Sequence, residues 1–186
     1  MPENNGAAAM IAIGIDPGVT GAIAAYCSAR GLLASAKLPV RVYTDPRAKI
    51  ARREVDPGGL RAVLQGWSAK HDFAGDYVIG AVERITARPG AQALTMLSLG
   101  HSCGVCVAVL GPFVRDILRP TPLQWKRAVG VTGEKTSSVA AVQRLLGVKV
   151  GHDRAEAILL AMWAAGEING PALSAATNII TLAEEA

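Results

Sequence analysis

The chain has 186 residues, which corresponds to one domain at roughly 100 to 200 residues per domain. With 51% hydrophobic and 18% charged residues, it has the composition of a chain that folds around a core, and this excludes an intrinsically disordered protein. Its 19 Lys and Arg residues against 15 Asp and Glu residues give a net charge of +4, which allows a polyanionic partner without requiring one.

The composition also predicts a compartment. The most apolar segments, residues 7–15, 103–114 and 155–165, are shorter than the ~18 uninterrupted apolar residues of a membrane span, so we expect no membrane insertion. Residues 1–5 contain an acid and no base, unlike the start of a secretory leader. Three cysteines in a chain of this size favour a reducing compartment over a disulfide scaffold, and we expect a cytoplasmic protein.

The first half of the chain predicts the order strand, strand, strand, helix, strand. Two apolar segments flank Pro17-Gly18-Val19-Thr20-Gly21, a pattern typical of a β-hairpin. Helical spacing of apolar residues follows Pro57, and the next apolar segment ends on Glu83. The predicted elements are strands at 10–16, 22–27, 32–38 and 77–83, a basic loop at 39–57 and a helix at 57–70.

The second half predicts alternating strands and helices, and hence an α/β fold. Thr121-Pro122 has the form of a helix N-cap followed by proline at the first helical position, and Gly147 marks a helix end. The last helix is apolar on nearly all sides, which is typical of a buried helix. The predicted elements are a helix from residue 91, strands at 105–109 and 114–118, and helices beginning at 122, 135–146 and 153–167.

Four acids stand where an apolar element meets a loop or where a helix begins: Asp16, Glu83, Asp153 and Glu156. Each has a structural explanation when taken alone. Asp16 before Pro-Gly can initiate a turn, Glu83 can be a solvated strand end, and Asp153-x-x-Glu156 resembles a helix capping box.

Together the four acids predict a metal site. Carboxylates at the ends of neighbouring strands converge, and residues three apart on a helix share one face. Converging carboxylates repel one another and need divalent cations, and oxygen ligands favour Mg²⁺ or Mn²⁺ over zinc. The chemistry that such a cluster serves best is phosphoryl transfer with two metal ions.

Four sequence motifs carry a family resemblance. The segments IGIDPGVTGAIA, VIGAVERITA, TPLQWKRAVGVTGEKTSSVAAVQRLL and HDRAEAILLA, in this order, resemble the RuvC family of Holliday-junction resolvases, and HDRAEA and LQWK look closer to its phage and organellar branches. The resemblance implies an RNase H-like fold with a central five-stranded mixed β-sheet flanked by helices. It also implies a homodimer that nicks four-way DNA junctions symmetrically with two Mg²⁺ ions per site, Mn²⁺ being able to substitute.

The resemblance assigns roles by motif. Asp16, Glu83, Asp153 and Glu156 match the family's metal-binding and catalytic acids, with Glu156 standing where many members have aspartate. Lys126 and Lys135 match the family's two active-site lysines, although each alone can equally be a solvated helix lysine. We expect residues 1–9 to be a flexible N-terminus, residues 10–169 to be the nuclease domain and residues 170–186 to be a C-terminal tail.

One position departs from the family pattern. Many bacterial members have an aromatic residue three positions after the strand-end glutamate, where it stacks into the opened junction, and this chain has Thr86. Arg84 and Arg88 can instead contact phosphates or stack on a base. The basic loop supplies four further predicted DNA contacts, which are Arg47, Lys49, Arg52 and Arg53.

Other candidates have stronger structural explanations. Cys103-x-x-Cys106 lacks the second cysteine pair of a zinc site, so we interpret these cysteines as structural thiols. Trp125 is interpreted as a core anchor rather than a platform for base stacking. His152 remains open between a proton donor, a neighbour of the metal and a polar residue at a helix start.

Three alternative functions stay open at this stage. The Asp16 hairpin also resembles the phosphate loop of actin-like and sugar-kinase-like ATPases, although those proteins need two lobes. The chain can also be a non-catalytic module that binds branched DNA, although binding a polyanion does not favour a cluster of acids. A related nuclease acting on other branched DNA or on RNA fits the same motifs.

Overall fold

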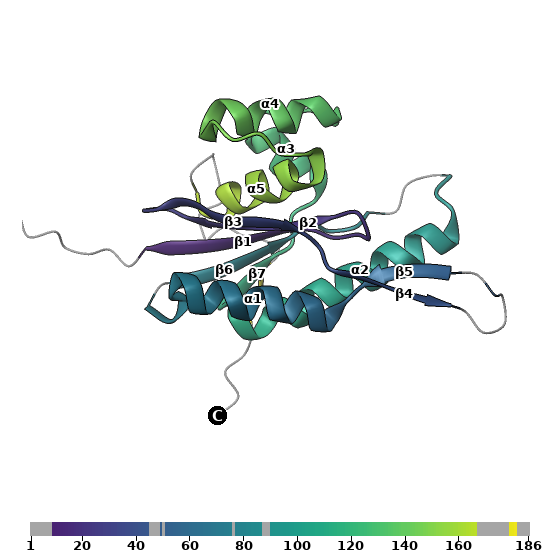
Figure 1. Cartoon of the computed structure of the whole chain (residues 1–186). Helices are drawn as coiled ribbons and strands as arrows, with labels where there is room; N and C mark the ends of the chain where they lie inside the picture. The colour runs from purple at the N-terminus through teal and green to yellow at the C-terminus, as the bar shows by residue number, and fades with distance from the viewer. Residues whose placement is uncertain are drawn as a thin grey trace, which may run out of the picture.

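The central feature of the fold is a mixed β-sheet, seen edge-on in Figure 1. The computed structural model describes residues 9–44, 49, 51–75, 77–86, 90–166 and 179–181. The strand order is β3-β2-β1-β6-β7-β8, in which β1 pairs antiparallel with β2 and parallel with β6. The strands are β1 (Met10–Asp16), β2 (Ala22–Cys27), β3 (Gly31–Lys37), β6 (Tyr77–Val82), β7 (Asp116–Leu118) and β8 (Ile179–Thr181). The predicted five-stranded mixed sheet is therefore confirmed, and the three-residue β8 extends it by pairing with β7.

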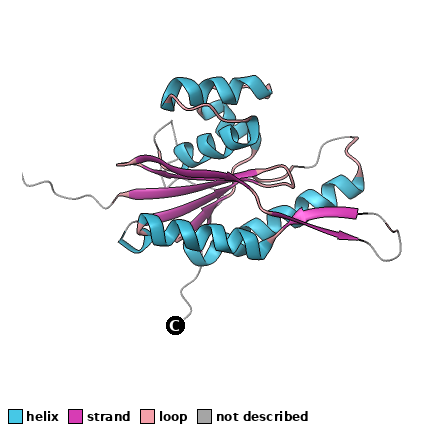
Figure 2. Cartoon of the chain, viewed as in Figure 1, coloured by secondary structure: helices cyan, strands magenta, loops and turns pink. Residues whose placement is uncertain are grey.

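Helices cover both faces of this sheet (Figures 1 and 2). On one face α5 lies against the strands with α3 and α4 outside it, and on the other face lie α1 and α2. Each helical layer encloses a hydrophobic cluster of its own. The helices are α1 (Pro57–His71), α2 (Ala93–Leu110), α3 (Pro122–Ala128), α4 (Lys135–Leu146) and α5 (His152–Ala164), and short 3₁₀ turns lie at Phe73–Gly75 and Gly111–Phe113.

The turn between β1 and β2 positions the first candidate acid. The amide of Gly21 donates to the carbonyl of Gly18 at 3.0 Å, and β1 then pairs in register with β2 from Asp16 back to Ile11. A Cβ at position 21 would overlap the carbonyl oxygen of Asp16, so only glycine fits this close turn. The predicted hairpin is confirmed, and it leaves Asp16 at the last position of a buried strand.

A second glycine sets how closely α5 approaches the sheet. Gly14 lies in the middle of β1, directly under α5, and a Cβ there would overlap the backbone of Ala157 and Ala161. The absence of a side chain lets the helix backbone lie against the strand backbone, a role that glycine has where two backbones meet. This contact brings the first turns of α5 next to the end of β1.

Local capping signals set several helix boundaries. Thr121 and Gln124 form a reciprocal capping box at the start of α3, as the Thr121-Pro122 pattern predicts. Gly147 ends α4 in the left-handed conformation at φ 70°, also as predicted. The N-cap of α5 is Gly151 and has no side-chain cap, so the alternative that Asp153 and Glu156 form a capping box is wrong.

The segment predicted as a basic loop is instead a β-ribbon. Val40–Thr44 (β4) and Ala51–Val55 (β5) pair antiparallel with each other and stand apart from the main sheet. The prediction was wrong because both faces of most of this ribbon are exposed, so its sequence lacks the alternation of apolar and polar residues that marks a half-buried strand.

The predicted strand at 105–109 is also wrong, because these residues form the second half of α2. A short apolar run does not by itself distinguish a buried strand from a buried helix segment. The combined segment Ala93–Phe113 is long and apolar enough to cross a membrane by length and composition alone. In this fold its second half is a core helix, with Cys103, Cys106 and Leu110 buried.

The predicted strand at 114–118 is present in shorter form as β7, and α5 ends at Ala164 rather than at Glu167. The proposed limits of the domain, the N-terminal segment and the tail fall mostly outside the described residues and stay predictions.

Candidate active site

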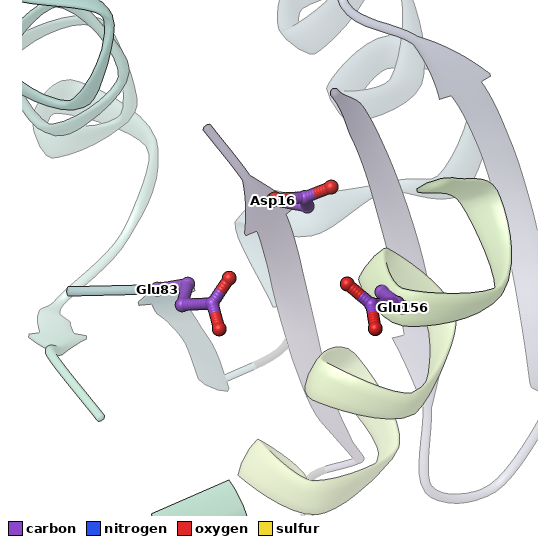
Figure 3. Close-up of side chains that lie close together, drawn as sticks. All are labelled: Asp16, Glu83 and Glu156. Carbon is purple, nitrogen blue, oxygen red and sulfur yellow. The ribbon is translucent and has the colours of Figure 1, made fainter. Parts of the chain in front are cut away.

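Three carboxylates from distant parts of the chain meet at one edge of the sheet (Figure 3). Asp16 ends β1, Glu83 directly follows β6, and Glu156 lies on the second turn of α5. One oxygen from each lies within 4.8 Å of the others. Because β1 and β6 are parallel neighbours with Ile15 opposite Val82, the two acids that follow this pair emerge side by side. We call these three residues the acidic cluster.

The electrostatics of the acidic cluster are unfavourable without a cation. Burial, followed in order of effect by the neighbouring charges of Glu83, Glu156 and Asp153, raises the pKa of Asp16 from 3.8 to about 8, although Lys126 partly lowers it. Near neutral pH, Asp16 is therefore largely protonated when no cation is bound. A group of oxygen donors that cannot all ionise together fits a hard divalent ion such as Mg²⁺ or Mn²⁺. The donor set thus agrees with the predicted metal site.

Glu156 is held by three side chains. Its Oε1 pairs with the ammonium group of Lys126, accepts a hydrogen bond from the Ser138 hydroxyl at 3.3 Å, and lies 3.6 Å from Nε2 of His152. Ser138 is fully buried on α4 and Glu156 is also buried. These contacts fix the carboxylate on the face of α5 that points to Asp16 (Figure 3).

Glu83 is fixed through its backbone and its side chain. Its amide donates to the carbonyl of Ile15 at 3.1 Å, and the next amide, that of Arg84, donates to the carbonyl of Pro120 at 2.8 Å. The indole N–H of the buried Trp125 donates to Glu83 Oε1 at 3.2 Å. The end of β6 is thus held between β1 on one side and the segment before α3 on the other.

A third group of contacts, made by Arg119 and by Cys103 of α2, supports the end of β6. Arg119 Nε donates to the carbonyl of Val82 at 3.1 Å, and its Nη2 lies 2.7 Å from the sulfur of Cys103. The Cys103 thiol in turn lies 3.7 Å from the carbonyl of Glu83. Cys103 and Cys106 are both buried in α2, and the acidic cluster is the one potential metal-binding group found among the described residues.

The acidic cluster opens into a cleft of about 410 Å³. One wall comes from the residues that follow Glu83, including Arg84 and Thr86, and another comes from the first half of α2. Lys126 and Pro122 also line the cleft. The cleft therefore combines three acids with two cations at a solvent-accessible edge, an arrangement that can hold a metal ion beside a phosphate group.

Two predicted catalytic residues lie outside the acidic cluster. Asp153 is half-buried and lines a separate hollow of about 240 Å³ with Lys37 and Arg53, although it is near enough to raise the pKa of Asp16. Lys135 is exposed at the start of α4, where its carbonyl oxygen lies 3.1 Å from Nδ1 of His152. His152 thus lies between Lys135 and Glu156.

The predicted DNA-binding residues lie in two places. Arg84 is exposed at the cleft, whereas Arg52 and Arg53 lie on β5 and Lys49 lies just before it. Arg47 and Arg88 lie outside the described residues.

Sequence reasoning missed the residues that support the acids. Gly14, Ser138, Arg119 and the N–H of Trp125 act through contacts between segments that are far apart in the sequence. Gly14, Ser138 and Trp125 lie within the family-like motifs, but the motifs alone do not predict these contacts. Trp125 is buried as predicted and also contacts an acid of the cluster.

The sheet order, the two helical layers and the acids at the ends of β1 and β6 define an RNase H-like α/β fold. Among solved structures, RuvC of T. thermophilus in complex with a Holliday junction substrate is similar, with a TM-score of 0.50, 20% sequence identity and coverage of 85% of this chain and 95% of that chain. A second structure of Thermus thermophilus RuvC matches with a TM-score of 0.44 and 19% identity over the same shares. No protein family model and no curated protein matches the sequence. The chain therefore has the fold of RuvC, as the motifs predicted.

Proposed function

We propose that this protein is a Mg²⁺-dependent, structure-selective DNA endonuclease that resolves four-way junctions by paired symmetric nicks, and so acts in DNA recombination and repair. The observation that carries the proposal is the acidic cluster at the ends of β1 and β6, within a fold shared with a RuvC structure that holds a Holliday junction substrate. A cluster of acids does not favour binding a polyanion, so its presence beside a basic surface supports catalysis rather than binding alone.

Asp16, Glu83 and Glu156 would hold the metal, and we propose Asp153, whose charge is near enough to raise the pKa of Asp16, as a ligand of the second ion. Two Mg²⁺ ions held there would supply an activated water and stabilise the leaving oxygen of a phosphodiester. Lys126 pairs with Glu156 and lines the cleft, so we assign it to the negative charge that develops on the phosphate. We also propose that Lys135, at the start of α4, and His152, which contacts the carbonyl oxygen of Lys135, take part in the active site.

The DNA would lie over the cleft and the β4–β5 ribbon. If metal ions neutralise the four proposed ligand acids, 19 basic residues remain against 11 acidic residues. This excess of positive charge favours binding to DNA. Arg52 and Arg53 are on the ribbon, and Arg53 also reaches back to donate to the carbonyl of Val19, next to the Asp16 turn, at 3.3 Å. This contact connects the ribbon with the active-site side of the molecule.

We further propose a homodimer, because a two-fold symmetric junction needs two active sites for two opposed strands. The exposed Leu94 and Leu97 on α2 supply apolar surface that a second copy could bury.

The test compares cleavage of a four-way junction, a flap, a duplex and an RNA–DNA hybrid in the presence of Mg²⁺. We expect symmetric nicks on the four-way junction only. The Asp16→Asn variant should lose at least ~100-fold of the cleavage rate while it still binds the junction, because the amide removes a carboxylate ligand from the metal that stabilises the transition state. Asp72→Asn, an exposed change at the end of α1, is the control.

Undiminished cleavage by Asp16→Asn would exclude the assignment. Cleavage of flaps or hybrids instead of junctions would favour a related nuclease, and junction binding without cleavage would favour a non-catalytic module.

A further inference from the structure

Two consecutive residues of α3 contact two different acids of the cluster. Lys126 pairs with Glu156, and the indole N–H of Trp125 donates to Glu83 Oε1 at 3.2 Å. Trp125 is 1% exposed and Glu83 is 9% exposed, so this hydrogen bond is buried. One short helix thus links the acid that follows β6 to the acid on α5.

We propose that Trp125 is a positioning residue for the metal site, and that its N–H fixes the carboxylate of Glu83 in the orientation that a divalent cation needs. The inference rests on the proposed function and adds to it a residue that does not itself touch metal or substrate. An indole N–H can only donate, so it always presents the same polarity to the carboxylate.

The placement of Trp125 is rigid enough for this role. The capping box of Thr121 and Gln124 fixes the start of α3, and the carbonyl of Trp125 accepts from the amide of Val129 at 3.0 Å. The ring itself is part of the hydrophobic cluster on the α5 face of the sheet. Carboxylates that bind metal are generally held by such outer hydrogen bonds, and removal of one lowers metal affinity by ~10- to 100-fold.

A purely structural role would predict something different. A buried tryptophan contributes to stability through its ring, and loss of the indole should then affect folding more than metal affinity. Trp163 offers a matched comparison, because it is buried in the same hydrophobic cluster and lies on α5 two turns beyond Glu156. Replacing either tryptophan with phenylalanine removes the same atoms from the same side of the sheet.

The experiment titrates the 186-residue protein with MnCl₂ in a calorimeter in the absence of DNA, and measures urea unfolding of the same samples. We expect Trp125→Phe to lower Mn²⁺ affinity by ~10- to 100-fold relative to wild type. Trp163→Phe should leave Mn²⁺ affinity unchanged even where it lowers stability. If Trp125→Phe does not fold, 3-benzothienylalanine at position 125 keeps the shape of the ring and replaces the N–H with sulfur, and it should show the same loss of affinity.

Wild-type affinity in the variant that lacks the N–H would overturn the inference and leave the proposed function standing. An equal loss in Trp125→Phe and Trp163→Phe would also overturn it, since that result would trace the effect to core packing. A wild-type protein that binds no Mn²⁺ would overturn the proposed metal site together with the inference, so the two failures are distinguishable.

Discussion

Folding and metal binding favour different protonation states of Asp16: the buried site favours the neutral acid, whereas a metal ion needs the carboxylate. Its pKa is raised to about 8 in the fold by burial and by the neighbouring acids, against 3.8 for an ordinary aspartate. Between these two values the folded protein binds more protons at this site than the unfolded chain does. The contribution of Asp16 to the free energy of unfolding is therefore greatest below about pH 4. It falls as the pH rises towards 8, by at most about 1.4 kcal/mol per pH unit.

We predict that the metal-free protein loses unfolding free energy between pH 5 and pH 8, and that Mg²⁺ stabilises it more at pH 8 than at pH 5. Asp16→Asn should flatten this pH dependence, because an amide does not titrate. Urea unfolding at several pH values in EDTA and in Mg²⁺ measures both effects, with Asp72→Asn as the control. A wild-type slope equal to that of Asp16→Asn would contradict the raised pKa.

At the scale of elements, the contact between β1 and α5 determines whether the acidic cluster can form. Gly14 allows the backbone of α5 to lie directly on β1, and Glu156 is positioned by the same helix. We predict that Gly14→Ala lowers the unfolding free energy by about 1–3 kcal/mol, since the new methyl group must displace helix backbone. The displaced helix should also raise the Mg²⁺ concentration needed for half-maximal cleavage.

Gly104→Ala is the matched control for this change. Gly104 lies in α2, and a Cβ there would meet no atom within 4 Å, so alanine should stabilise the helix by about 0.5–1 kcal/mol. Chemical denaturation and Mg²⁺ titration of the cleavage rate check both variants. Equal stability of Gly14→Ala and wild type would show that α5 can shift at no cost.

The elements that sequence predicted correctly are those with signals in their own residues. Pro-Gly in the first turn, the Thr121 cap and the Gly147 stop are local, and the structure follows each of them. The prediction for the second half of α2 is wrong because the state of a short apolar run depends on what packs against it, and the prediction for the β4–β5 ribbon is wrong because strands exposed on both faces carry no clear burial pattern.

The same distinction applies to the active site. Acids at strand ends can be predicted, since parallel strands bring their ends together, and Asp16 and Glu83 do meet. The donors that hold these acids cannot be predicted in this way. Trp125 and Ser138 reach them only after α3 and α4 have packed over α5, and nothing in their own sequence neighbourhoods encodes that contact.

At the scale of the whole molecule, the acidic cluster is complete within one chain. Asp16, Glu83 and Glu156, together with Lys126 and Trp125, all come from the same copy. In the proposed homodimer we therefore expect each active site to hold its metal with acids of its own subunit. Symmetric resolution would then result from two independent nicks made in one complex, rather than from a single site shared between subunits.

This independence predicts the behaviour of a mixed dimer that contains one wild-type and one Asp16→Asn subunit, purified with two different affinity tags. On a supercoiled plasmid that extrudes a cruciform, the wild-type dimer should give linear product, because both strands are cut in one complex. The mixed dimer should give nicked circles, with one active site still working. Gel electrophoresis distinguishes the two products, and a mixed dimer that cuts neither strand would show that the subunits depend on each other for catalysis.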